Sequence, residues 1–131
     1  MFKKDSVVSL DTGLFLIRLG LGLVFVVHGW GKLDDLAGTV GFFNNAGLPA
    51  VVAYLVAVIE FVGGIAMIAG VWTKWAGWLL AIIMAGAILF VKGKMGFIGG
   101  YEFDLSLLLM ALGVAFMGPG ELTIHTFLGR N

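Results

Sequence analysis

Long apolar segments dominate this chain of 131 residues. Four of them, each close to 20 residues, extend approximately over residues 10–30, 50–72, 75–91 and 101–117. A helix needs about 20 apolar residues to cross a hydrocarbon core of about 30 Å. The runs are continuous and lack the alternation of barrel strands, so backbone hydrogen bonding in lipid requires helices. The pattern predicts an all-α membrane protein built as a four-transmembrane-helix bundle.

The composition agrees with this pattern and narrows the possible functions. Hydrophobic residues make up 60% of the chain and charged residues 12%, with a mean hydropathy of +1.07, far from the values of soluble domains. The connections between runs are short, so we expect a single transmembrane domain over residues 1–131. The net charge of zero gives no indication of nucleic-acid binding. With no cysteine, any redox role must use a bound cofactor or a partner protein.

Four spans place both termini on the same side of the membrane. Basic residues are slightly more numerous on that side, where Lys3, Lys4, Lys74 and Arg130 lie, than on the other, where Lys32, Lys92 and Lys94 lie. Because basic residues are enriched in cytoplasmic segments, this count predicts termini in the cytoplasm.

Two ionisable residues lie deep inside the first two runs. Arg18 is about 12 Å and Glu60 about 18 Å from the side of the termini, at a rise of about 1.5 Å per residue. A carboxylate facing lipid is costly, so Glu60 should face the bundle interior, either ionised against Arg18 or neutral. We predict that Arg18 and Glu60 pair. Such a pair either handles protons beside a ligand or only fixes which helix faces which.

A second group of polar residues lies at the opposite surface. It comprises His28, Lys32, Asp34, Asp35, Lys92, Lys94, Glu102 and Asp104. Asp104 and Glu102 have a structural explanation, since acidic residues in a first helical turn complement the helix dipole. His28 is either a hydrogen-bonded residue near a helix end or a functional group. The other histidine, His125, lies on the opposite side, and no spacing in the chain is typical of a metal site.

Several stretches, in order, resemble the DoxX family of small four-helix membrane proteins. They are "RLGLGLVFVVHGWGKL", "FFNNAGLP" in the first loop, "IEFVGGIAMIAGVWTKWAG", "GFIGGYEFDLSLLL" and "GPGELTIH". The resemblance implies that the family's motif residues correspond here to Arg18, to His28 and Lys32 of the HGxxK element, to Glu60 and to Glu102. It departs in the last stretch, where Thr123 and His125 stand in place of the expected serine and aspartate.

The resemblance implies an integral protein of a bacterial or archaeal cytoplasmic membrane that serves quinone-linked oxidoreductases. In that hypothesis Glu60 handles protons, Arg18 is its charge partner, and His28, Lys32 and Glu102 line the mouth of a site for quinone or another small apolar ligand. The partners would be the bilayer, a redox-enzyme subunit and a second copy of the chain. The alternative hypothesis is a non-enzymatic scaffold or assembly factor that anchors a partner protein, with Arg18 and Glu60 locking the bundle. Whether the chain is itself an enzyme stays open.

Overall fold

The structure is a computed structural model that describes residues 4–129, and this part of the chain is helical without strands. It contains four helical segments long and apolar enough to cross a membrane, Val8–Asp34, Ala50–Ala69, Thr73–Met95 and Phe97–Met117. The prediction of an all-α protein with four membrane-spanning helices is therefore confirmed. Lys3 and Arg130, which entered the topology count, lie outside the described residues. The side of the membrane on which the termini lie stays a prediction.

The long helices are α1 (Lys4–Asp34), α3 (Ala50–Ala69), α4 (Thr73–Ala87) and α5 (Glu102–Met117). Two short helices, α2 (Leu36–Asn45) and α6 (Ile124–Gly129), complete the chain. Between α4 and α5 the helix widens to a π-helix, η1 (Ile88–Lys92), followed by a 3-10 turn, η2 (Gly93–Met95), and an irregular turn, η3 (Phe97–Tyr101). Positive φ angles at Gly96 and Gly99 reverse the chain there, as the glycine-rich sequence permits.

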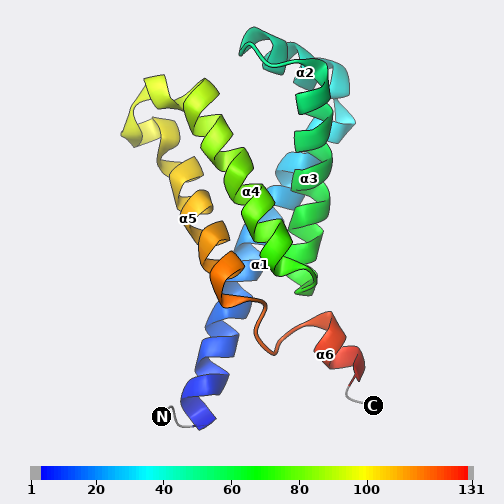
Figure 1. Cartoon of the computed structure of the whole chain (residues 1–131), viewed down its shortest axis with the longest axis vertical. Helices are drawn as coiled ribbons and strands as arrows, with labels where there is room; N and C mark the ends of the chain where they lie inside the picture. Colours follow the sequence, from blue (N-terminus) through cyan, green and yellow to red (C-terminus); the bar gives the residue numbers. More distant parts are fainter. Residues whose placement is uncertain (1–3, 130–131) are drawn as a thin grey trace.

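The bundle consists of two antiparallel helix pairs. α1 packs along α3, and α4 packs along α5, with a smaller contact between α3 and α4 (Figure 1). The two pairs approach each other at one end and diverge toward the end that carries α2, which packs against α3 (Figure 1). This divergence leaves room between the pairs on the α2 side.

A buried apolar cluster joins the pairs where they approach. Its members come from all four long helices: Leu14, Leu21, Phe25, Met67, Ala76, Leu80, Ala81, Met84, Leu107, Ala111 and Val114. Many large apolar side chains on the outside of the bundle are exposed in the isolated chain. An exterior of this kind is suited to lipid, where a soluble protein would carry polar groups.

Glycines set the close contact between α1 and α3. A Cβ atom at Gly64 would lie 2.7 Å from the Val26 nitrogen and 2.8 Å from the Gly22 carbonyl oxygen, and a Cβ at Gly29 would collide with the backbone of Phe61. Backbone atoms cannot move aside as side-chain ends can. These small residues therefore fix both the distance and the register of the two helices.

Gly64→Ala should force α1 and α3 apart. We expect a loss of about 1–3 kcal/mol in the free energy of unfolding, the usual range for overpacking a tight contact. Gly20→Ala is the matched control, because a Cβ there meets no atom within 4 Å. Chemical unfolding in detergent, followed by circular dichroism, measures both variants. Equal effects of the two substitutions would contradict this account of the contact.

One short helix, α2, lies where the sequence pattern predicts a connection. Residues 31–49 were interpreted as a short loop, but α2 occupies most of them, because the Asp35 carboxylate accepts the Gly38 N–H at 3.0 Å and caps a new helix. α2 ends before Gly47, whose φ is 84°, and Pro49 is the extended N-cap residue directly before α3. With 10 residues, α2 is too short to span the membrane, so the sequence criterion for spans did not reveal it.

Candidate functional site

A cavity of about 360 Å³ lies between the two helix pairs on the side of α2. Its walls come from α1, α2, α3, α4, η1 and α5, and most of its lining is apolar, including Phe25, Phe43 and Leu107. Five ionisable residues interrupt this lining, namely His28, Lys32, Glu60, Lys92 and Asp104. Apolar pockets with a few polar groups are typical of small-molecule sites.

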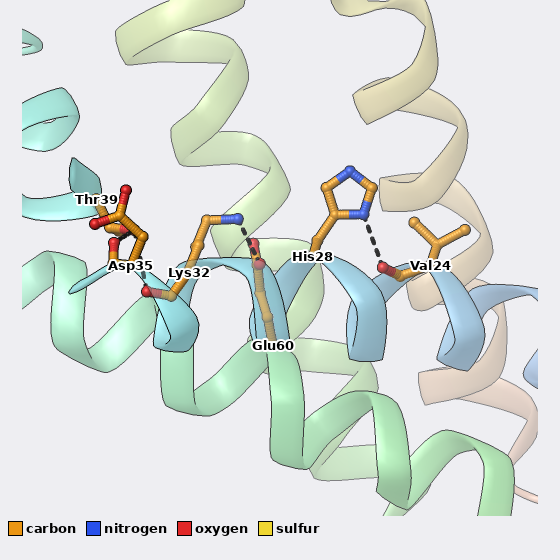
Figure 2. A network of polar contacts seen from close by, with 6 residues as sticks. All are labelled: Val24, His28, Lys32, Asp35, Thr39 and Glu60. Atoms are coloured by element: carbon orange, nitrogen blue, oxygen red, sulfur yellow. Dashed lines mark hydrogen bonds and ion pairs between the residues drawn. The ribbon is translucent and has the colours of Figure 1, made fainter. Parts of the chain in front are cut away.

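Lys32 and Glu60 form an ion pair across the α1/α3 contact. The Lys32 Nζ donates to Glu60 Oε2 at 2.7 Å, and the two side chains are 24% and 4% exposed. Figure 2 shows the lysine reaching from the last turn of α1 toward the carboxylate on α3. The pair compensates a carboxylate that would otherwise be buried alone, which is the arrangement expected for a charge inside a membrane bundle.

His28 lies one turn before Lys32 on α1. Its Nδ1 lies 2.8 Å from the Val24 carbonyl oxygen (Figure 2). A carbonyl only accepts, so Nδ1 carries a proton, and in the neutral ring Nε2 is therefore a free acceptor. This places a group that can accept a proton or a hydrogen bond on the wall that also carries Lys32 and Glu60.

Hydrogen bonds at the junction between α1 and α2 fix the position of α2 beside the cavity. The Thr39 hydroxyl donates to the carbonyl oxygens of Lys32 and Asp35, at 3.1 and 2.8 Å (Figure 2). These bonds and the Asp35 cap orient α2, which adds Phe42 and Phe43 to the cavity lining. The "FFNNAGLP" stretch is thus part of the candidate site.

Lys92 and Asp104 supply charge from the opposite helix pair. The Lys92 Nζ lies 3.6 Å from Asp104 Oδ2, and the two side chains are 37% and 10% exposed. This distance is beyond hydrogen-bond range. Asp104 Oδ2 is buried, and it has no hydrogen-bond partner. The π-helix η1 ends at Lys92, and π-helical turns are frequent at functional sites.

The predicted pairing of Arg18 with Glu60 is wrong. Arg18 is fully buried at the other end of α3, where its guanidinium donates to the carbonyl oxygens of Met67, Ile68, Pro119 and Leu122 at 2.8–3.2 Å. Glycine contacts set a register in which Arg18 faces Met67 and Ile68. Ile68 is eight residues beyond Glu60, about 12 Å along the helix, and Lys32 takes the carboxylate instead.

The structure thus brings together three of the five predicted site residues. His28, Lys32 and Glu60 line the cavity; Arg18 lies at the far end of α3, and Glu102 is absent from the cavity lining. Asp104 and Lys92 line it, although the sequence analysis placed them only in the surface layer. In the described part of the chain, no group of three or more His, Cys, Asp or Glu residues is arranged to hold a metal ion.

Comparisons with known proteins agree with this fold. The family model for DoxX matches residues 13–93. "Putative oxidoreductase CatD" of Bacillus subtilis (strain 168) is 39% identical over 92% of this chain and 90% of its own length. "Inner membrane protein YqjF" of Escherichia coli (strain K12) is 28% identical over 92% of this chain and 95% of its own length.

A third relative is an uncharacterized membrane protein of Mycobacterium tuberculosis (strain ATCC 25618 / H37Rv). It is 34% identical over 87% of this chain and 80% of its own length. No solved structure matches the chain at a significant level. The bacterial relatives and the four apolar spans together indicate an integral protein of a bacterial membrane. This chain belongs to the DoxX family.

Proposed function

We propose that this chain is the quinone-binding membrane subunit of an oxidoreductase system. The observation that carries the proposal is the apolar cavity between the helix pairs, with charged residues from both pairs in its lining. Its volume of about 360 Å³ lies within the usual range of small-molecule sites. The name of the Bacillus subtilis relative supports a link to oxidoreductases.

The polar groups suit the protons of a quinol. Oxidation of a quinol to a quinone releases two protons and two electrons. His28 Nε2 is placed to accept one proton, and Glu60, held beside Lys32, is a second acceptor facing the same space. The electrons pass to a partner enzyme, and the apolar lining of the cavity accommodates the ring and the beginning of an apolar tail.

In this proposal the two residues of the ion pair have different roles: Lys32 donates hydrogen bonds and Glu60 accepts a proton. One N–H of the Lys32 ammonium group donates to the Glu60 carboxylate, and its remaining N–H groups can donate to a quinone carbonyl. Glu60 is 3% exposed, so a proton that it accepts is held out of contact with bulk water. In this proposal Lys32 replaces Arg18 as the charge partner of Glu60.

The scaffold hypothesis is less well supported. A chain that only anchors another protein needs no internal cavity, whereas this chain has an apolar cavity with a few ionisable groups in its lining, as small-molecule sites have. The segment 92–104 at the divergent end of the bundle would be the docking surface in that case. A partner enzyme can dock there in both hypotheses, so the cavity distinguishes them better than the surface does.

Mass spectrometry of lipid-soluble molecules that co-purify from native membranes tests the proposal. We expect a quinone in roughly stoichiometric amount with the wild-type chain and at least about tenfold less with Glu60→Gln, which loses a charged hydrogen-bond partner in the cavity. Glu121→Gln, at an exposed position outside the cavity, is the matched control.

Thermal unfolding in detergent must show that Glu60→Gln is still folded when its ligand content is measured. Equal quinone content in wild type and Glu60→Gln would remove Glu60 from the site. A wild-type sample without quinone, but with a partner protein in stoichiometric amount, would favour the scaffold hypothesis.

A further inference from the structure

Asp104 carries a buried acceptor to which no group in the described part of the chain donates a hydrogen bond. Its side chain is 10% exposed and lines the cavity, and its Oδ2 has no hydrogen-bond partner. Most buried polar atoms in proteins are hydrogen-bonded, and a buried unpaired acceptor typically costs about 1–3 kcal/mol. Lys92 offsets the charge at 3.6 Å without making the bond. A donor bound in the cavity would supply the missing hydrogen bond.

Helix capping does not account for this carboxylate. Asp104 is the third residue of α5, where a negative charge complements the helix dipole, but α5 has no side-chain capping bond at its start. The preceding acidic residue, Glu102, already provides a negative charge in the same turn from outside the cavity. The dipole explains why acidic residues are tolerated there and leaves the inward direction of Asp104 unexplained.

The cavity contains a second acceptor on the opposite wall. Because Nδ1 of His28 donates to Val24, Nε2 of the neutral ring can only accept. Asp104 and His28 come from different helix pairs, and in the described part of the chain no ion pair joins the α1/α3 pair to the α4/α5 pair. A ligand with donors at two positions would satisfy both walls at once.

The oxidised and reduced forms of a quinone differ in the hydrogen-bond donors that they carry. A quinone carries two carbonyl oxygens and only accepts, so its lone pairs would face Asp104 Oδ2 and His28 Nε2. A carbonyl can accept from Lys32 or Lys92, but this leaves Asp104 Oδ2 and His28 Nε2 without a donor. A quinol carries two hydroxyl groups that donate, and a hydroxyl bonded to a carboxylate forms a strong charge-assisted hydrogen bond.

We propose that the cavity binds the quinol in preference to the quinone, and that Asp104 is the residue that determines this preference. This inference rests on the proposed function, since it concerns the same cavity. It assigns Asp104 as the acceptor for one hydroxyl group, with His28 or Glu60 as the acceptor for the other.

Binding measurements on the purified full-length chain in lipid nanodiscs test the inference. Isothermal titration under nitrogen is made with decylubiquinol, decylubiquinone and the 1,4-dimethyl ether of the quinol, which keeps the ring but has no donor. We expect the wild type to bind decylubiquinol about tenfold more tightly than either other probe. In Asp104→Asn the affinity for the quinol should fall about tenfold and that for the quinone should stay within about twofold.

Glu102→Gln is the matched control, because it changes a carboxylate two residues away, outside the cavity lining, and should leave all three affinities unchanged. Equal affinity for quinol and quinone, or an unchanged preference in Asp104→Asn, would overturn the role of Asp104 and leave the proposed function standing. If no probe binds the wild type, the proposed function itself fails. The dimethyl ether tests the need for a donor in the wild type, so that test holds even if Asp104→Asn does not fold.

Discussion

Arg18→Met is expected to lower the free energy of unfolding by about 3–5 kcal/mol, because it leaves several buried carbonyl groups without donors. Arg18 donates from Nε to Met67, from Nη2 to Ile68, and from Nη1 to Pro119 and Leu122. Chemical unfolding in detergent, followed by circular dichroism, measures the effect.

These bonds join three parts of the fold. Met67 and Ile68 belong to the last turn of α3, where carbonyl groups have no partner within the helix and the dipole favours a cation. Pro119 and Leu122 belong to the segment between α5 and α6. Gly70 completes the arrangement, since a Cβ there would lie 2.5 Å from Arg18 Nη2. Arg18 therefore caps α3 from a neighbouring helix and ties the C-terminal segment to the bundle.

Two further variants make this prediction specific. Arg18→Lys keeps the charge but cannot form the planar fork of bonds, so it should recover only part of the stability. Leu16→Ala removes a side chain on the exposed face of α1 and should change stability little. Limited proteolysis should cut Arg18→Met faster than wild type between residues 118 and 123. An Arg18→Met protein as stable and as protease-resistant as Leu16→Ala would contradict the capping role.

Lys32→Met is expected to destabilise the chain by about 3 kcal/mol, because it leaves the Glu60 carboxylate buried without its cation. Glu60→Gln should cost less, about 1–2 kcal/mol, since the remaining lysine can extend toward the membrane surface. The double variant should be no less stable than Lys32→Met, giving a coupling of at least about 1–2 kcal/mol. Equilibrium unfolding of the four proteins in detergent measures this cycle.

Two control cycles distinguish the pair from a general effect of charge. Lys94→Met changes an exposed lysine at the same end of the bundle, and its effect should add to that of Glu60→Gln. The cycle between Arg18 and Glu60 should also be additive, because the structure places them at different levels of α3. Additivity between Lys32 and Glu60 would contradict the ion pair, and coupling between Arg18 and Glu60 would contradict the observed register.

The candidate site was predictable in part, and the failures have physical causes. His28 and Lys32 end the first apolar run, and Glu60 interrupts the second, so their depth follows from counting residues. Counting from the ends of runs did not reveal the register of α1 against α3, because backbone contacts at Gly22, Gly29 and Gly64 set it. A contact at glycine leaves no periodic signal that predicts which residues lie opposite each other.

The cavity-facing position of Asp104 could not be predicted for a second reason, the rotation of α5 about its own axis. Asp104 lies two positions after Glu102, which corresponds to a rotation of about 200° around a helix. Only one of the two can therefore face the cavity. Apolar residues surround α5 on every side, as in many membrane helices, so the pattern gives no preferred face. A signal that could have favoured Asp104 was Lys92 at the end of the preceding helix, which the hairpin brings next to it.

By itself, the sequence determined the number of membrane spans and the all-α class, because lipid requires long apolar helices whose backbone groups bond within the segment. Only the tertiary structure decided which charges meet. The pairing of Lys32 with Glu60, the capping of α3 by Arg18 and the inward direction of Asp104 depend on helix register and rotation. Close packing sets both, and it acts between residues far apart in the chain.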